Sequence, residues 1–406
     1  MSMQSSKPLS SRTMTGVILI LSPLIFAFAL ALDIYVPSIP QIRGHFGVSQ
    51  SVMQLTVSLF LLVTGLAQLI MGPVSDQIGR RKVALCSILL LLVGSVICAV
   101  SPNMSLLIFG RIIEALGACG MMVTCFAIVR DLFSEEECPR VYSFLNSTIS
   151  LSPLLAPMIG GYLAYFFSWR ATFAFLALVA LLIFFLAKKD INETLDPKNK
   201  RNLRKEFFLD YGHVLKNPCF SAYAFCASAG FACFLTFFSL SSYIIINLLK
   251  VPEQHFGFYF AAIAVIFFFS SLLCGLVTVR LGTYRTVLIG GFLILLAGLV
   301  MRFWYQDFGL SMYGFMGPMM IMGLGGAFVM GGSAGGAISP FPEMAGTASA
   351  LFGCLQFAFA FVVSQVVLHW KVKSTLPLSY TLMALGVSSV LVMLLSYPKL
   401  KAKPTK

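Results

Sequence analysis

The stretch GPVSDQIGRRK, residues 72–82, is a short charged break between two long apolar runs. These runs cover about residues 51–72 and 83–101, and each provides the roughly 20 mostly apolar residues that a membrane-spanning helix requires. Within the break a single acid, Asp76, precedes three consecutive cations at residues 80–82. The arrangement predicts two transmembrane helices joined by a polar loop at one side of a membrane.

The composition of the whole chain agrees with this interpretation. Of the 406 residues, 58% are hydrophobic and 11% are charged, and the mean hydropathy is +0.91. Soluble domains carry about 25% charged residues, so a soluble chain this apolar could not cover its surface with polar groups. The composition excludes a soluble globular enzyme, a nucleic-acid-binding domain and a disordered chain. It predicts an all-α membrane protein.

On both sides of residues 72–82, a window of about 20 residues finds twelve apolar spans. They cover about residues 16–39, 51–72, 83–101, 105–129, 141–166, 169–187, 218–247, 255–279, 285–304, 310–338, 343–369 and 376–397. The longest polar stretch lies between the sixth and seventh spans. We therefore expect an N-terminal six-helix bundle at residues 1–187, a basic linker at 188–217, and a C-terminal six-helix bundle with a short tail at 218–406.

The cations indicate how the chain is oriented. With the N-terminus in the cytoplasm, 21 of the 28 Lys and Arg residues fall in cytoplasmic segments and 6 in outer loops. This asymmetry follows the positive-inside rule, so both termini and the linker are expected on the cytoplasmic side. The net charge of +13 is then explained by topology and by anionic lipid headgroups. No nucleic-acid partner is expected.

The two halves of the chain contain an internal repeat. Residues 72–79 and 275–282 both match the pattern G-x-V-[ST]-x-x-[IL]-G, at an offset of 203 residues. Each match follows the second span of its half, which indicates duplication of a six-span unit. Transporters built from two such halves place the substrate site between them, near the middle of the membrane.

Five segments of the chain resemble motifs of the major facilitator superfamily, and specifically of its twelve-span drug:proton antiporters of the bicyclomycin/chloramphenicol-resistance (Bcr/CflA) subgroup. The segments are ALDIYVPSIP at 31–40, GPVSDQIGRR at 72–81, RIIEALGA at 111–118, SPLLAPMIGG at 152–161 and PEMAGTASA at 342–350. Two features depart from the family pattern. Glu114 stands where the family usually has Gln, and Ser152 and Ala156 replace two glycines of the antiporter motif.

The resemblance implies roles for two of these segments. The loop residues Gly72, Asp76, Gly79, Arg80 and Arg81 would form a cytoplasmic gate in which Asp76 accepts charge-assisted hydrogen bonds. The alternative is a solvated cluster of charges that only sets the topology.

The fourth segment is expected to serve as a hinge. It contains Pro153, Pro157, Gly160 and Gly161. Proline removes a helix hydrogen bond and glycine removes bulk, so neighbouring helices can approach and pivot there. The alternative is an ordinary span, because proline and glycine are common in transmembrane helices.

Asp33 is an acid within an apolar run. A charge at the bilayer centre costs about 2.5–3.5 kcal/mol on insertion scales, so such acids face a cavity or a partner. Asp33 is therefore a candidate proton carrier and cation contact. The alternative is an interfacial residue near the outer end of the span, because Pro37 and Arg43 follow closely.

Arg111 and Glu114 are two further charged groups inside a span. Their spacing of three residues places them on one face of a helix. They either form a local ion pair or exchange protons and substrate. Among the polar residues of other spans, Gln54, Asn146 and Gln356 either line a cavity or only bond between helices. Tyr35 is a further cavity candidate.

The sequence predicts a proton-coupled exporter of drugs or small amphipathic compounds that works by alternating access. The alternative is a transporter of one specific metabolite, such as a siderophore or polyamine, on the same fold. No HExxH, GxSxG or nucleotide-binding P-loop motif occurs, so an enzyme is not expected. No cofactor or metal is expected either. The resemblance implies a monomer in the cytoplasmic (inner) membrane of a bacterium.

Overall fold

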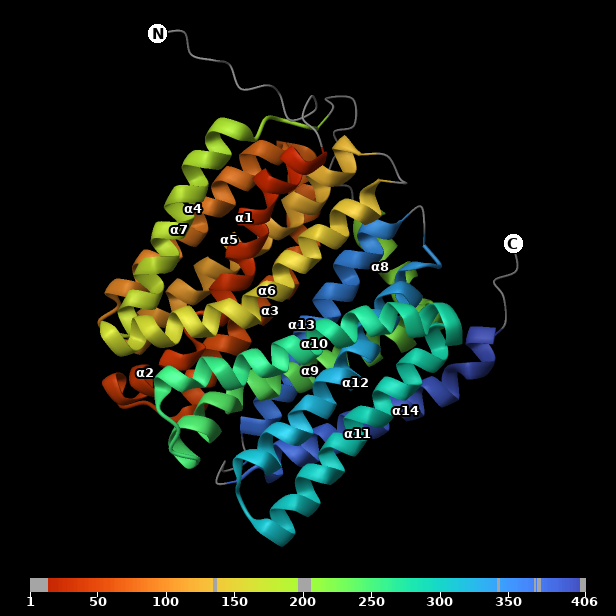
Figure 1. Cartoon of the computed structure of the whole chain (residues 1–406). Coiled ribbons are helices and arrows are strands. Elements are labelled where there is room, and N and C mark those ends of the chain that lie inside the picture. The colour runs from red at the N-terminus through yellow and green to blue at the C-terminus, as the bar shows by residue number, and fades with distance from the viewer. Residues whose placement is uncertain are drawn as a thin grey trace. The chain divides into compact units, whose positions relative to one another are not determined.

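The computed structural model describes residues 14–133, 137–195, 206–341, 344–368, 370 and 374–401. Over these residues it contains twelve spans long and apolar enough to cross a membrane (Figure 1). The prediction of an all-α fold with twelve spans is confirmed. The α-helices are α1 (Met14–Asp33), α2 (Ile39–Phe46), α3 (Gln50–Ile78), α4 (Arg80–Val100), α5 (Met104–Leu132), α6 (Cys138–Phe166), α7 (Trp169–Asp190), α8 (Glu206–Lys216), α9 (Pro218–Ser242), α10 (Glu253–Leu281), α11 (Thr283–Phe308), α12 (Met312–Ile338), α13 (Ala345–Leu368) and α14 (Leu376–Lys401).

The first span is interrupted, whereas its sequence predicts one continuous run. α1 ends at Asp33, a 3₁₀ turn covers Val36–Ser38, and α2 begins at Ile39. Pro37 accounts for the break, because proline lacks a backbone N–H and disfavours helical geometry in the residue before it. Asp33 therefore lies at the C-terminal end of a helix, in the interior of a span.

The polar loop predicted at residues 72–82 is in fact almost entirely helical. α3 continues to Ile78 and α4 begins at Arg80, so only Gly79 separates the two helices. Gly79 adopts a φ of +112°, which a residue with a side chain rarely adopts. Asp76 consequently lies in the last turn of α3, and Arg80 lies in the first turn of α4.

The helices pack in two compact units. The first comprises Met1–Gly47 and Leu66–Arg204, and the second comprises Val48–Gly65 and Lys205–Lys406. The first part of α3 is thus grouped with the second unit, which differs from the boundary expected at residues 188–217. The division into 1–187, 188–217 and 218–406 stays a prediction. Within that expected linker, Glu206–Lys216 forms α8, and residues 196–205 lie outside the described part of the chain.

The internal repeat extends to the packing of the helices. In the first unit α4 packs against α5 and α7, and α1 packs against α5, α6 and α7. In the second unit α11 packs against α12 and α14, and α9 packs against α12, α13 and α14. In both repeats the third span therefore contacts the fourth and sixth, and the first span contacts the fourth, fifth and sixth.

Glycine pairs bring the third and fourth spans of each repeat together. A Cβ atom on Gly94 would lie 2.8 Å from the carbonyl oxygen of Gly110, which belongs to α5. A Cβ atom on Gly290 would lie 2.7 Å from the carbonyl oxygen of Gly325, which belongs to α12. Small residues allow this close approach of helix backbones within a membrane.

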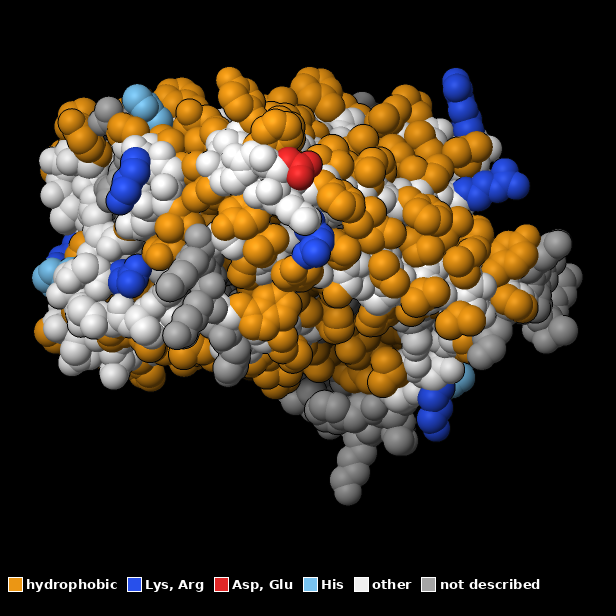
Figure 2. Space-filling view, turned by 90° about the horizontal axis from the view of Figure 1, so that it is seen from below, with side chains coloured by type: hydrophobic (Ala, Val, Ile, Leu, Met, Phe, Trp, Pro, Cys, Tyr) orange, Lys and Arg blue, Asp and Glu red, His pale blue; other side chains and the backbone are white. Residues whose placement is uncertain are grey.

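Hydrophobic side chains dominate the face seen in Figure 2, with few charged side chains among them. Several large apolar side chains are more than half exposed, among them Phe185, Phe269, Leu276 and Leu395. Soluble monomers rarely expose extensive apolar patches. Together with the twelve spans, this surface identifies a multi-pass membrane protein.

Candidate functional site

Asp33 is buried in the first unit, with only 2% of its surface exposed. Its Oδ2 accepts a hydrogen bond of 2.7 Å from the hydroxyl group of Ser152 in α6. Its Oδ1 is buried too, and has no hydrogen-bond partner among the described residues. The carboxyl group therefore has one oxygen held by α6 and one oxygen available to a proton or a ligand.

Small side chains bring α6 close to this carboxyl group. Ser152, Ala156 and Gly160 recur at intervals of four residues, so they lie along one face of α6. A Cβ atom on Gly160 would overlap the carbonyl oxygen of Ile34, the residue after Asp33. The sequence motif at 152–161 thus packs against the break in the first span.

The prolines and the remaining glycine of that motif lie in the same helix. Pro153 and Pro157 are inside α6, and Gly161 is buried. Because each proline lacks a backbone N–H, α6 has interrupted helix hydrogen bonds beside Asp33. Their role as a hinge stays a prediction.

Arg111 and Glu114 form a completely buried ion pair in α5. Arg111 Nη1 donates to Glu114 Oε2 at 2.7 Å, and it also donates to the carbonyl oxygen of Ala31 at 2.8 Å. Ser95 in α4 donates to Glu114 Oε1 at 2.7 Å. The pair therefore connects α4, α5 and the end of α1, two residues before Asp33.

Tyr35 supports the same guanidinium group. The guanidinium carbon of Arg111 lies 4.2 Å from the centre of the Tyr35 ring, a cation–π contact. The ring itself is fully buried. Asp33, Tyr35, Arg111 and Glu114, which the sequence singles out separately, are thus held around one helix end in the first unit.

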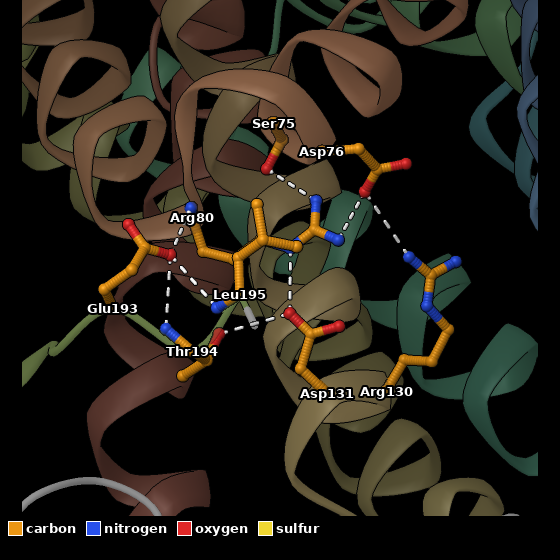
Figure 3. A network of polar contacts seen from close by, with 8 residues as sticks. All are labelled: Ser75, Asp76, Arg80, Arg130, Asp131, Glu193, Thr194 and Leu195. Carbon is orange, nitrogen blue, oxygen red and sulfur yellow. Dashed lines mark hydrogen bonds and ion pairs between the residues drawn. The ribbon is translucent and has the colours of Figure 1, made fainter. Parts of the chain in front are cut away.

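A second polar network surrounds Arg80, whose side chain is nearly completely buried (Figure 3). Arg80 Nη1 donates to Ser75 Oγ at 2.9 Å, and Nε donates to Asp131 Oδ2 at 2.9 Å. Its Nη2 forms an ion pair with Asp76. Asp76 also lies 3.6 Å from Nη2 of Arg130. The predicted gate residues Asp76 and Arg80 are therefore in contact with each other, and two acids share the Arg80 guanidinium group.

The other predicted gate residues surround the same turn. Arg81 Nη2 donates to the carbonyl oxygen of Lys188 at 3.0 Å. Gly79 permits the turn through its positive φ. Gly72 lies in α3, where an added Cβ would meet no atom within 4 Å.

The remaining cavity candidates do not belong to this group of residues. Gln54 is fully buried, and its Nε2 donates to the carbonyl oxygen of Ser239 at 3.0 Å. Gln356 is partly buried in α13. The side chain of Asn146 lies outside the described part of the structure. Whether these residues line a cavity stays a prediction.

Sequence reasoning missed most of the partners that hold the charged groups in place. The missed residues are Ser75, Ser95, Asp131, Glu193 and Thr194. Asp131 offered one usable signal, because it is an acid that follows directly on an apolar span. Ser152 was singled out only as a departure from the motif, and its contact with Asp33 could not be predicted.

Comparison with known proteins identifies the family. The sequence pattern of the Major Facilitator Superfamily matches residues 21–364. The chain belongs to this superfamily. It is therefore a membrane transporter of the major facilitator type and not an enzyme.

Relatives of this major facilitator transporter include proteins with resistance functions in their names. It is 31% identical over 357 residues to a chloramphenicol resistance protein of Pseudomonas aeruginosa, covering 86% of this chain and 83% of that protein. It is 28% identical over 368 residues to a bicyclomycin resistance protein homolog of Haemophilus influenzae, covering 88% and 90%. The resemblance to the Bcr/CflA subgroup is confirmed.

A solved structure shares the fold of the transporter. A crystal structure of a D-xylose-proton symporter superposes with a TM-score of 0.75 at 17% sequence identity, covering 97% of this chain and 100% of that chain. At this level of identity the likeness establishes the fold alone.

Proposed function

We propose that this major facilitator transporter exports drugs or small amphipathic compounds in exchange for protons, by alternating access. The names of its relatives, which are chloramphenicol and bicyclomycin resistance proteins, support the class of substrate. The inward movement of protons supplies the driving force, because each charge crossing the membrane contributes about 2.3 kcal/mol per 100 mV.

The observation that carries the proton coupling is the environment of Asp33. A carboxyl group inside a membrane span is costly to insert and is retained where it faces a cavity or a partner. Here Ser152 holds one carboxyl oxygen, and the other has no partner among the described residues. Such a group can take up a proton and release it when its surroundings change between the two states of the cycle.

The ion pair of Arg111 and Glu114 complements Asp33 in this proposal. Arg111 reaches from α5 to the carbonyl oxygen of Ala31 at the end of α1. A movement of α1 on proton uptake would therefore change the hydrogen bonds of Arg111 and, through them, its ion pair with Glu114. The network around Asp76 and Arg80 acts as the cytoplasmic gate, opening and closing as the transporter changes state.

The location of the transporter belongs to the same proposal. We expect a monomer in the bacterial inner membrane, with both termini in the cytoplasm, because the cations follow the positive-inside rule. The bacterial relatives support this location.

The decisive experiment measures proton release from the purified transporter in detergent while a panel of drugs is added. Wild-type protein should release protons on binding chloramphenicol-like or bicyclomycin-like compounds. Asp33→Asn should bind without release, because the amide cannot exchange a proton. Export in everted membrane vesicles should then depend on the proton gradient in the wild type and be lost in Asp33→Asn.

Each outcome has a distinct meaning. Binding without proton release in the wild type would contradict antiport. Release with one metabolite and with no drug would favour a specific exporter over a drug exporter. An Asp33→Asn variant that still releases protons would remove Asp33 from the coupling mechanism and leave the export proposal standing.

A further inference from the structure

The segment that follows α7 returns to the gate network and makes contact with it. α7 ends at Asp190, and Ile191–Leu195 then runs alongside the turn between α3 and α4. Ile191 is fully buried and Leu195 is almost fully buried. These two apolar side chains fix both ends of the segment against the first unit.

Glu193 supplies a helix cap that Gly79 cannot provide. The first backbone N–H groups of a helix have no partner within it, and a side chain of the residue before the helix often accepts from them. Gly79 occupies that position before α4 and has no side chain. Glu193 Oε1 instead accepts from the backbone N–H of Arg80 at 2.8 Å. A carboxylate at this end of a helix is also favoured by the helix dipole.

The same carboxylate organises its own segment and occupies the space beside Gly79. Glu193 Oε1 also accepts from the backbone N–H groups of Thr194 and Leu195, both at 3.2 Å. A Cβ atom on Gly79 would overlap Glu193 Oε2. Glycine at residue 79 therefore serves two purposes, because it allows the positive φ and leaves room for the carboxylate.

Thr194 reaches the other end of Arg80. Its hydroxyl group donates to Asp131 Oδ2 at 3.2 Å, the same oxygen that accepts from Arg80 Nε (Figure 3). Glu193 thus holds the backbone of Arg80, and Thr194 orients the acid that holds its guanidinium group. Two neighbouring residues of one segment act on both ends of a single gate residue.

We propose that Ile191–Leu195 is a clasp that positions Arg80 in the gate, with Glu193 and Thr194 as its positioning residues. The role of the clasp in transport rests on the proposed function, whereas its effect on Arg80 does not. The clasp begins the connection from α7 to α8, so it links that connection to the state of the gate.

The surroundings of Glu193 allow the clasp to open. Glu193 is exposed to solvent, and a cavity of about 440 Å³ lies beside it, lined also by Gly79, Arg81, Lys82 and Leu195. Water can therefore replace the backbone N–H groups around the carboxylate when it leaves α4. Arg80 is by contrast nearly completely buried, so it stays in place only while its acids and the clasp remain aligned.

The first test measures Arg80 directly, in lipid nanodiscs and without any substrate. Exchange of backbone amide hydrogens is followed in the first turn of α4, and ¹⁵N-arginine NMR follows the Nε–H group of Arg80, assigned with Arg80→Lys. Glu193→Ala should speed exchange of the Arg80 amide by about fivefold, as expected for loss of a helix cap. Glu193→Gln, which keeps an acceptor without the charge, should have a smaller effect. Thr194→Val should shift the Arg80 Nε–H signal.

Asn192→Ala provides the matched control, because Asn192 lies in the same segment and makes none of these contacts. Unchanged amide exchange in Glu193→Ala, together with an unchanged Nε–H signal in Thr194→Val, would overturn the clasp. Equal effects in Asn192→Ala would overturn it as well, since they would reflect general loosening of the segment.

The second test separates positioning from stability. Glu193→Ala should lower the maximal rate of drug transport several-fold and leave the Kd for drug unchanged. The reason is that Glu193 contacts none of the proposed binding residues Asp33, Arg111 and Glu114. A change in Kd without a change in rate would overturn the positioning role. If the wild type transports no drug, the proposed function fails, and the amide exchange and NMR measurements still decide whether the clasp positions Arg80.

Discussion

The charged side chains of the first unit differ in how many partners hold them. Arg111 and Glu114 are both completely buried and bonded to each other. Arg80 is nearly as buried and is shared between Asp76 and Asp131. Among the described residues, the Asp33 carboxyl group has a single hydrogen-bond partner, Ser152. The residue with the fewest partners is thus the one best suited to change its protonation during transport.

The buried ion pair leads to a prediction about stability. Removing one partner of a buried pair leaves an uncompensated charge and costs about 3–5 kcal/mol. Arg111→Met and Glu114→Leu should each lower the unfolding free energy in detergent by that order. The double variant should lose much less than the combined loss of the two single variants. Additive losses, measured by denaturant unfolding, would show that the two side chains do not depend on each other.

The hydroxyl group of Ser152 leads to a prediction about activity. Ser152→Ala removes the hydrogen bond to the Asp33 carboxyl group. The loss of a hydrogen bond worth about 1–1.5 kcal/mol should slow proton-coupled transport about tenfold. Ser152→Thr keeps the hydroxyl group and should retain most of the activity. Thr148→Ala is the control, because the Thr148 hydroxyl bonds to the carbonyl oxygen of Phe144 in its own helix. Wild-type rates in Ser152→Ala vesicles would refute the positioning of Asp33 by Ser152.

At the level of helices, close crossings decide which polar groups meet. α4 and α5 approach where Gly94 faces Gly110, and this approach allows Ser95 to reach Glu114. α6 approaches the end of α1 at Gly160, and Ser152 on the same face reaches Asp33. In both cases a small residue sets the distance between two helices, and a serine on the same helix makes the polar contact.

The crossing of α4 and α5 should therefore be sensitive to added bulk. A Cβ atom on Gly94 would lie 2.6 Å from the backbone nitrogen of Glu114 and 2.7 Å from its Cγ. Gly94→Val should destabilise the protein by about 1–3 kcal/mol, the usual cost of overpacking. Gly335→Val in α12 is the control, because a Cβ there meets no neighbouring element within 4 Å and no proline directly follows it. Thermal unfolding in detergent provides the measurement, and equal melting temperatures for the two variants would contradict the tight crossing.

At the scale of the whole molecule, two units repeat one pattern of packing. The third span of each contacts the fourth and sixth, and glycine pairs mark the contact between the third and fourth in both. The charged networks around Arg80 and Arg111 nevertheless lie in the first unit. The corresponding turn of the second unit has Val279 where the first has Asp76. The duplication therefore preserved the arrangement of helices, while residues 76 and 279 diverged in charge.

The predicted orientation can be tested on whole cells. With the N-terminus in the cytoplasm, the end of α11 faces outward and the end of α10 faces inward. Cysteines introduced at the exposed residues Gln306 and Arg280, in a background without native cysteines, should differ in labelling by a membrane-impermeant maleimide. Gln306→Cys should react in intact cells, and Arg280→Cys should react only after the cells are opened. The reverse pattern would invert the topology.

The twelve spans, the internal repeat and the acids within apolar runs could be predicted from the sequence, because they depend on local composition and on motif spacing. The family was indicated by the resemblance of five segments. The sequence also located Asp33, Arg111, Asp76 and Arg80 as the residues of interest. It overestimated the loop at residues 72–82, because helix ends are not distinguished from loops by polarity alone.

The partners of these residues could be identified only in the folded chain. Ser152 meets Asp33 across 119 residues of sequence, and Glu193 meets Arg80 across 113. Contacts at such separations depend on how far each helix is rotated and shifted against its neighbours. The rotation and shift follow from side-chain packing at helix crossings such as that of Gly94 with Gly110. The hydrophobic pattern of a single span does not specify this rotation and shift.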